Sequence, residues 1–185
     1  MNNTDKIDID IFKVVTRAIA ESDNLEIMTD HLAQLLVGAL DIKACSLFAF
    51  NKQTEELEIL GSFGLSIDYI NKGPLLADKS IGCLLKKEAM VVGDVTRTDL
   101  LQYPEAAAKE GVVAIVSVPI IFLGKAVGTL RLYHHRVWDI SQRDLDSLFL
   151  LAETIGLAMG YTRLRNTLNA VNGILKDLHR VWLAH

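Results

Sequence analysis

The chain has 185 residues, of which half are apolar, and a formal net charge of −4. This length and hydropathy predict one domain with a sizeable core and exclude a disordered chain. The lack of a basic cluster argues against nucleic-acid binding, and no apolar segment reaches the roughly 18–20 residues of a membrane-spanning helix. The polar, acidic start of the sequence is unlike a signal peptide, so we expect a soluble, cytoplasmic protein.

Two amphipathic helices are expected at the N-terminal end. The first covers residues 7–20, and the second follows a polar break that supplies Asp23 or Asn24 as its N-cap. Apolar residues form a stripe on the first helix and a face on the second: Phe12, Val15 and Ile19, then Met28, Leu32, Leu35, Leu36, Ala39 and Leu40. Both helices therefore offer one face to a core.

Short strands, loops and short helices are expected in the middle of the chain. The strands are predicted at 44–50, 57–61 and 90–95, a helical turn around 67–70, and short helices at 81–87 and within 99–109. Ser80 is placed to cap the first of these short helices, and Pro104 confines the second to the residues around and after it. The rest of 62–80 is expected to be loop.

The segment from Gly111 to His135 is the most informative part of the sequence. An almost purely apolar run, 112–123, is followed by a turn and then by alternating residues over 126–134, which predicts an antiparallel hairpin. Its first strand should be buried on both faces. Its second strand has one aliphatic face and one face that carries Thr129, Arg131 and Tyr133, which is one way to build a ligand pocket.

One long helix is expected from Ser141 to about Leu183, because a capping-box-like Ser-x-x-Asp begins it and no proline follows. At 1.5 Å per residue it is roughly 60 Å long, so its distal half needs a partner outside the core. Its apolar residues recur at heptad spacing: Leu164, Leu168, Val171, Leu175, Leu178 and Trp182. This pattern predicts a dimeric coiled coil, the alternative being a helix that folds back on its own domain. Upstream, Ala152, Gly156 and Gly160 predict close approach of a helix or sheet, or else a kink.

Four motifs, in this order, resemble the GAF domain family of small-molecule sensory modules. They are VVGDV at 91–95, AIVSVPI at 114–120, GKAVGTLRL at 124–132 and WDISQRDLDSL at 138–148. The resemblance covers about residues 10 to 163. It implies an α+β fold: an antiparallel sheet of five to six strands, the N- and C-terminal helices on one face, and loops and short helices over a pocket on the other. We therefore expect a sensory domain at 1–163 and a coiled-coil extension at 164–185.

Several ligand classes of this family have motifs that the chain lacks. Asn51-Lys52 and Asn71-Lys72 occur without the Phe and Asp-Glu of the cyclic-nucleotide-binding members, and neither cysteine has the neighbour that bilin-binding members use. Haem-binding members need an axial histidine, for which only His134 and His135 lie near the pocket. Adjacent strand residues point to opposite faces, which favours solvated histidines over a metal site. The cofactor stays unknown.

Seven residues are candidates for the pocket: Phe48, Cys83, Asp94, Tyr103, Ser117, Arg131 and Tyr133. Arg131 either binds an anionic ligand, since a guanidinium fits a carboxylate or phosphate, or pairs with a loop acid such as Asp94. Cys83 is either redox-active or a small buried residue. Phe48, Ser117 and Tyr133 either contact a ligand or serve packing alone. Tyr103 either contacts a ligand or is a surface aromatic.

These expectations describe a non-enzymatic sensor domain that binds a small molecule, acts as a homodimer and passes its signal through the last helix. The expected partners are a second copy of the chain, a small ligand that is anionic if Arg131 binds it, and a downstream signalling protein. The alternatives are a structural dimerisation or adaptor domain without ligand, and a methionine sulfoxide reductase of the same fold. The last of these would depend on Cys83.

Overall fold

The computed structural model describes residues 7–22, 24–80 and 83–183, with side chains described except at 83, 85 and 176–183. The helices are α1 (Ile9–Glu21), α2 (Leu25–Leu40), α3 (Ile67–Ile70), α4 (Cys83–Lys86), α5 (Pro104–Glu110) and α6 (Gln142–Leu183), with a 3-10 turn, η1, at Val95–Arg97. The strands are β1 (Ala44–Asn51), β2 (Glu56–Phe63), β3 (Met90–Val92), β4 (Ala114–Phe122) and β5 (Lys125–His134). The boundaries differ from the predicted ones by a few residues.

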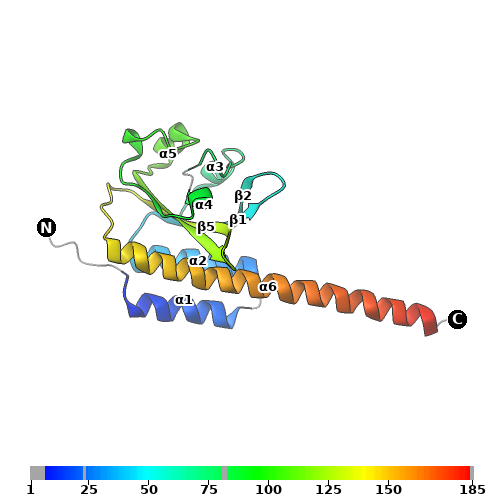
Figure 1. Ribbon diagram of the computed structural model, residues 1–185. Helices are drawn as coiled ribbons and strands as arrows, with labels where there is room; N and C mark the ends of the chain where they lie inside the picture. The colour runs from blue at the N-terminus through cyan, green and yellow to red at the C-terminus, as the bar shows by residue number, and fades with distance from the viewer. Residues whose placement is uncertain (1–6, 23, 81–82, 184–185) are drawn as a thin grey trace.

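The strands form one antiparallel sheet in the order β2-β1-β5-β4-β3. Figure 1 shows α1, α2 and α6 along one face of this sheet and α3, α4 and α5 on the other. The predicted α+β fold, with its two unlike faces, is therefore confirmed. We call the two faces of the sheet the helix face and the loop face.

The hairpin of β4 and β5 forms as predicted. Its turn residues, Leu123 and Gly124, both have positive φ angles, 49° and 71°, which match the right-handed twist of a two-residue hairpin. The first seven residues of β4 are all buried, which confirms a strand covered on both faces. On β5, Leu130 and Leu132 belong to the apolar core on the helix face, so Thr129, Arg131 and Tyr133 point to the loop face.

The buried face of α2 differs from the predicted one. Leu35 is half-buried and Ala39 is exposed, whereas Thr29 and Ala33 are fully buried. The cause is the close approach of α2 to β2: a Cβ on Gly61 would lie 2.5 Å from the Thr29 backbone. Small residues therefore occupy the contact, and the Thr29 hydroxyl donates a hydrogen bond to the Leu60 carbonyl at 2.8 Å.

The N-terminal half of α6 packs on β4 through small residues. Ser141 caps the helix by accepting a hydrogen bond from the Asp144 amide, as the sequence predicts. A Cβ on Gly156 would lie 2.5 Å from the Ile121 carbonyl oxygen, and one on Gly160 would meet the Phe122 ring. The expected close approach of a sheet explains the glycine stripe.

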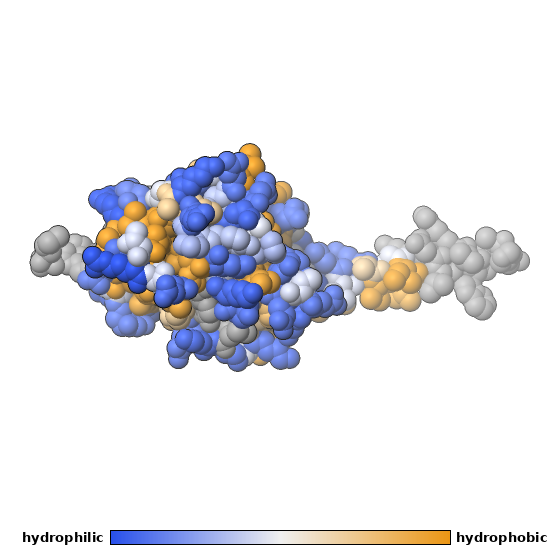
Figure 2. All heavy atoms as spheres, turned by 90° about the horizontal axis from the view of Figure 1, so that it is seen from above, coloured by the Kyte–Doolittle hydropathy of each residue, from blue (hydrophilic) through white to orange (hydrophobic). Residues whose placement is uncertain are grey.

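The C-terminal half of α6 projects beyond the domain, as Figure 1 shows, so the alternative of a helix that folds back is wrong. Apolar side chains on this part are about half exposed: Leu164, Leu168, Val171 and Leu175. Figure 2 shows the rod with apolar side chains at its far described end. The side chains of Leu178 and Trp182 lie outside the described residues. No helix among the described residues has the length and apolar character needed to cross a bilayer.

Candidate functional site

A row of polar side chains crosses the loop face of the sheet, with Arg131 at its centre. The strand registers place Ser62, Ser46, Arg131 and Ser117 side by side on β2, β1, β5 and β4. The hydroxyls of Ser46 and Ser62 are 2.9 Å apart and hydrogen-bonded. We call these four residues the polar row. The polar row places hydrogen-bonding groups of four neighbouring strands in one line across the loop face.

Arg131 is the most unusual member of the polar row because its side chain is charged and only 3% exposed. Its Nη1 donates to the Ser80 hydroxyl at 3.1 Å, Nη2 to the Ser80 carbonyl at 3.4 Å, and Nε to the Ser117 hydroxyl at 3.5 Å. The guanidinium carbon lies 5.4 Å from the centroid of the Phe48 ring. Among the described residues no carboxylate lies within ion-pair distance of Arg131. Within the described part of the chain, the hydrogen-bond partners of this buried charge are therefore neutral.

Asp94 does not supply the missing counter-charge. Its carboxylate caps η1 by accepting from the Thr96 amide and hydroxyl, at 3.0 and 2.6 Å, and it pairs with Arg97 at 3.2 Å. The hydrogen bonds from Thr96 hold the pKa of Asp94 below its usual value. The alternative prediction of an Arg131–Asp94 ion pair is wrong, and Asp94 is not among the residues that line the cavity described next.

A cavity of about 360 Å³ lies on the loop face against β1 and β2. Phe48 and Tyr133 form its floor on the sheet. Apolar residues supply much of the remaining wall: Leu57, Ile59, Leu65, Ile70, Pro74 and Leu75. Three charged residues also line it, Lys72 from the loop after α3 and two acids, Glu56 and Glu58, from β2. Its volume falls in the range of small-molecule pockets.

Lys72 is a second cation without a carboxylate in ion-pair distance among the described residues. Its ammonium donates to the Tyr69 carbonyl at 2.8 Å and lies 3.9 Å from the centroid of the Tyr69 ring. Burial, together with the charge of Arg131, lowers the pKa of Lys72 to about 8, although Glu110 acts in the opposite direction. Glu110 itself is hydrogen-bonded to Ser66 and pairs with Lys43 at 3.4 Å. Lys72 lines the cavity and Arg131 does not, although the charge of Arg131 acts on Lys72.

Tyr103 holds the loop that carries Lys72. Its hydroxyl donates to the Pro74 carbonyl at 2.7 Å, and a Cβ on Gly73 would lie 2.7 Å from that hydroxyl oxygen. Gly73 has a φ of 130°, which only glycine adopts readily. The loop also pairs with the edge of β2, where the Leu57 amide donates to the Leu75 carbonyl at 2.8 Å. Tyr103 therefore acts on the cavity by positioning its wall.

The sequence identified the sheet part of this site and missed the loop part. Phe48, Ser117, Arg131 and Tyr133 share the loop face, but of these four only Phe48 and Tyr133 line the cavity. Cys83 begins α4, and its side chain lies outside the described residues. The sequence analysis did not single out four residues of the site: Tyr69, Lys72, Ser80 and Ser46. For the first three the reason is that no spacing rule connects such a residue to a strand more than 50 positions away. The available signal for the polar row was one serine in each of the strands predicted at 44–50 and 112–123, Ser46 and Ser117.

The histidines and the other cysteine lie away from the cavity. His134 is 4% exposed and packs against Trp138 at a ring distance of 5.3 Å, so the expectation that both histidines are solvated is wrong for this one. It is buried because it continues the alternation of Leu130 and Leu132, which face the helices. Cys45 belongs to the core of the helix face, where burial raises the pKa of its thiol. Within the described part of the chain, no three His, Cys, Asp or Glu residues cluster as metal ligands.

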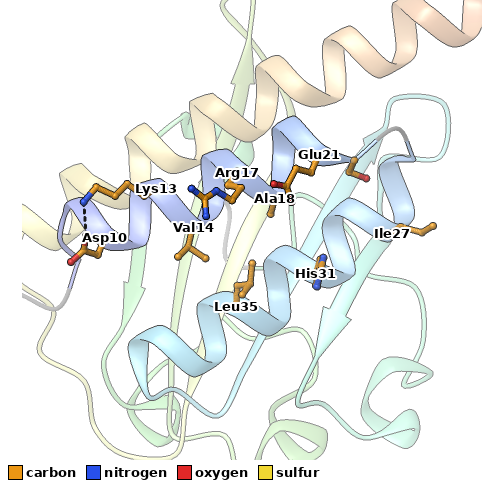
Figure 3. A pocket seen from close by; sticks show the side chains of 10 residues that line it. Asp10, Lys13, Val14, Arg17, Ala18, Glu21, Ile27, His31 and Leu35 are labelled. Atoms are coloured by element: carbon orange, nitrogen blue, oxygen red, sulfur yellow. Dashed lines mark hydrogen bonds and ion pairs between the residues drawn. The ribbon is translucent and has the colours of Figure 1, made fainter.

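A groove of about 660 Å³ lies between α1 and α2 (Figure 3), and another concavity of about 840 Å³ is lined by residues such as Leu25, Phe122 and Met159. Val14 and Leu35 point into the space between the two helices, and Asp10 and Lys13 form an exposed ion pair at 2.7 Å on its rim. The groove is open along its length and has no buried polar side chain in its lining. It resembles a helix surface more than a small-molecule site.

Comparisons with known proteins agree with the architecture. The GAF domain family model matches residues 22–160, whereas no curated protein sequence matches the chain. Among solved structures, the GAF domain of a phosphoenolpyruvate-protein phosphotransferase from Coxiella burnetii has a TM-score of 0.77 at 19% identity, covering 86% of this chain and 96% of that one. A free methionine-R-sulfoxide reductase from Neisseria meningitidis, in complex with its substrate, has a TM-score of 0.73 at 15% identity, covering 85% and 90%. A domain of a two-component sensor histidine kinase protein from Sinorhizobium meliloti has a TM-score of 0.69 at 17% identity, covering 80% and 99%. With its family model matched over most of its length, the chain belongs to the GAF domain family.

Proposed function

We propose that this chain is a small-molecule-binding sensory domain that works as a homodimer and passes its signal through α6. The observation that carries the proposal is Arg131, a buried cation beside a cavity with no carboxylate partner among the described residues. Removing a charge from water costs several kcal/mol unless an opposite charge compensates. An anionic ligand would supply that charge, and the serine hydroxyls around Arg131 compensate only in part.

The homodimer is supported by the exposed face of α6. Apolar residues continue the predicted heptad seam upstream into the domain: Leu150, Leu157 and Tyr161 are 53%, 63% and 66% exposed and precede Leu164 at heptad positions. The residues of α6 that pack on the sheet, such as Leu148, Leu151 and Ile155, lie on a different face of the helix. A second copy can therefore cover the seam without disturbing the core.

A physical connection between the cavity and the seam supports the signalling role. Arg131 and Tyr133 stand on β5, which forms the hairpin with β4, and the end of β4 touches α6 at Gly156 and Gly160. A ligand that shifts the hairpin would therefore change how α6 packs. The size of that change is limited by the difference in ligand affinity between the two arrangements.

A thermal-shift screen tests the ligand-binding proposal. We expect an anion among cyclic nucleotides, 2-oxo acids and amino acids to raise the melting temperature of the wild type and to lose this effect in Arg131→Met. Arg97→Met is the matched control, because Arg97 lies on the surface at η1 and should leave the shift unchanged. If the wild type binds one of these compounds and Arg131→Met binds it equally well, the assignment of the ligand to Arg131 is wrong.

A second candidate function is a methionine sulfoxide reductase that depends on Cys83. The fold likeness to the reductase from Neisseria meningitidis and to one from Staphylococcus aureus, at 16% identity, motivates this candidate. Cys45 does not support it, because a thiol buried on the helix face with a raised pKa is a poor nucleophile. We expect no turnover of free methionine sulfoxide by the wild type; turnover that disappears in Cys83→Ser would establish the reductase instead.

A further inference from the structure

We propose that two copies of the chain pair through α6 in antiparallel orientation, with the C-terminal half of each helix lying along the N-terminal half of the other. The arrangement rests on the proposed homodimer and specifies how its two subunits meet. Three features of α6 support it: the charges of its two halves, the spacing of the seam and the packing that each half receives.

The two halves of α6 carry opposite charges. The N-terminal half, 142–162, contains three acids and one arginine, a net charge of −2. The C-terminal half, 163–183, contains four basic residues and one acid, a net charge of +3. Two of the three acids, Asp146 and Glu153, are exposed, and each lies four residues before a seam residue, hence beside the seam. A parallel pair would place like charges together, whereas an antiparallel pair places the acidic half beside the basic one.

The spacing of the seam fits complete overlap of the two helices. With Gln142 of one copy opposite Leu183 of the other, every apolar layer is complete. The opposing residues are then Leu150 and Leu175, Thr154 and Val171, Leu157 and Leu168, and Tyr161 and Leu164. A heptad seam matches itself in this way at only one of seven successive alignments, and complete overlap selects that one.

The layers of the antiparallel pair combine large residues with smaller ones. A parallel pair would stack Thr154 on Thr154 and Tyr161 on Tyr161, which gives one polar layer and one crowded layer. In the antiparallel pair Tyr161 meets the smaller Leu164, and Thr154 meets Val171. The Thr154 hydroxyl already donates to the Leu150 carbonyl at 2.9 Å, so its methyl group can serve the seam. Alternation of large and small residues fills such a core more evenly.

The two halves of α6 differ in the packing that they receive from their own chain. The N-terminal half is fixed on the sheet, with Leu151 and Ile155 in the core of the helix face. The C-terminal half projects beyond the domain, and its seam residues are about half exposed (Figure 1). A helix without tertiary packing is only marginally stable in water. Antiparallel pairing therefore places each projecting half on a fixed half, whereas parallel pairing would join two projecting halves.

Disulfide cross-linking tests the orientation on the full chain, with Cys83→Ser as the background of every sample. We expect Leu157→Cys and Leu168→Cys, co-expressed with different affinity tags and isolated as the mixed dimer, to form a bridge on mild oxidation. Each variant alone is the matched control and should form at least about tenfold less bridge. In the antiparallel pair the two copies of position 157 are about 16 Å apart along the helix axis, far beyond the roughly 7 Å between Cα atoms that a disulfide allows.

Charge reversal at Glu153 provides a second readout that depends on orientation. In the antiparallel pair Glu153→Lys adds a cation beside the basic half of the other copy, so the dissociation constant of the dimer should rise about fivefold. In a parallel pair the same substitution would relieve repulsion between the two acidic halves, and the dimer would not weaken. Glu88→Lys is the matched control, because Glu88 is exposed, lies before β3 and changes the net charge equally. Sedimentation velocity over a concentration series measures the three dissociation constants.

The outcomes separate the orientation from the homodimer itself. A bridge in Leu157→Cys alone, or a dimer that Glu153→Lys leaves unchanged or strengthens, overturns the antiparallel arrangement while the homodimer stands. A dimer in which neither the mixed sample nor the single variants form a bridge overturns it as well. A wild type that sediments as a monomer contradicts the proposed homodimer before orientation is considered.

Discussion

Gly156→Leu is expected to lower the free energy of unfolding by about 3 kcal/mol, the upper end of what overpacking costs in a core. A Cβ at this position already lies 2.5 Å from the Ile121 carbonyl oxygen and 3.2 Å from the Ile120 side chain. The first of these atoms is backbone, so it cannot move aside by changing rotamer. α6 would have to lift away from β4, which opens the core on the helix face. For a chain of this length the melting temperature should fall by roughly 6–12 °C.

Gly38→Leu is the matched control because Gly38 is also helical but has no atom within 4 Å of its hypothetical Cβ. There the better helix propensity of leucine should raise the free energy of unfolding by roughly 0.5–1 kcal/mol. Denaturant unfolding of both variants measures the two opposite changes. Equal effects of the two substitutions would show that α6 does not pack closely on β4 at Gly156. They would then contradict the contact through which we propose that the sheet communicates with α6.

Most of the fold follows from the sequence because its longest elements have clear periodicity. The hairpin of β4 and β5 combines a doubly buried run with an alternating one, and α6 combines a cap with an uninterrupted helical pattern. The face of α2 was predicted less well, since Leu35 and Ala39 fit a helical stripe as well as Thr29 and Ala33 do. Close packing against Gly61 selects the smaller residues, and this tertiary contact is not visible in the periodicity of α2 alone.

The candidate site was predicted only where it lies on the sheet. Strand alternation places Arg131 and Tyr133 on one face, so their common direction follows from sequence. Apart from Ser117, the hydrogen-bond partner of Arg131 is Ser80, in the loop that precedes α4. Lys72 lies in the same irregular segment. The path of that segment is set by tertiary contacts, such as the hydrogen bond from Tyr103 to Pro74, which connect residues about 30 positions apart. Asp94 is a comparable case: its local capping bonds to Thr96 prevail over a distant ion pair.

For the seam of α6, too, the sequence pattern predicted one part and tertiary contacts determine the other. Heptad spacing predicted its distal part, where nothing else determines the pattern. Within the domain, α6 carries two sets of apolar residues, one that packs on the sheet and one that continues the seam. Because the two sets alternate along the same helix, the sequence does not show which residue belongs to which set. Burial separates them, because Leu151 and Ile155 are fully buried whereas Leu150 and Leu157 are more than half exposed. The interface proposed for a second copy therefore begins beside the GAF domain.

If the chain forms the proposed homodimer, Leu157→Glu is expected to convert it into a monomer at micromolar concentration without unfolding the domain. Leu157 is 63% exposed, so the substitution costs the monomer little, whereas in the dimer it would bury a carboxylate of each copy in an apolar seam. Sedimentation velocity measures the oligomeric state, and circular dichroism checks that the helix content is unchanged. Val137→Glu, at an apolar residue that is 66% exposed and lies before α6, is the matched control and should remain dimeric.

The position of Leu157 means that this variant also tests which part of α6 forms the proposed interface. If the contact between copies were limited to the projecting part of α6, Leu157→Glu would remain dimeric while Val171→Glu became monomeric. Three heptads on two chains are marginal by themselves, and the seam beside the domain adds about two more. In the proposed function, a signal from the cavity would reach α6 at Gly156 and Gly160, which contact β4 in the same turns of the helix as Leu157 and Tyr161. A partner that contacts α6 at these turns would register a change in helix packing directly. A wild type that sediments as a monomer would contradict both the dimer and this route for the signal.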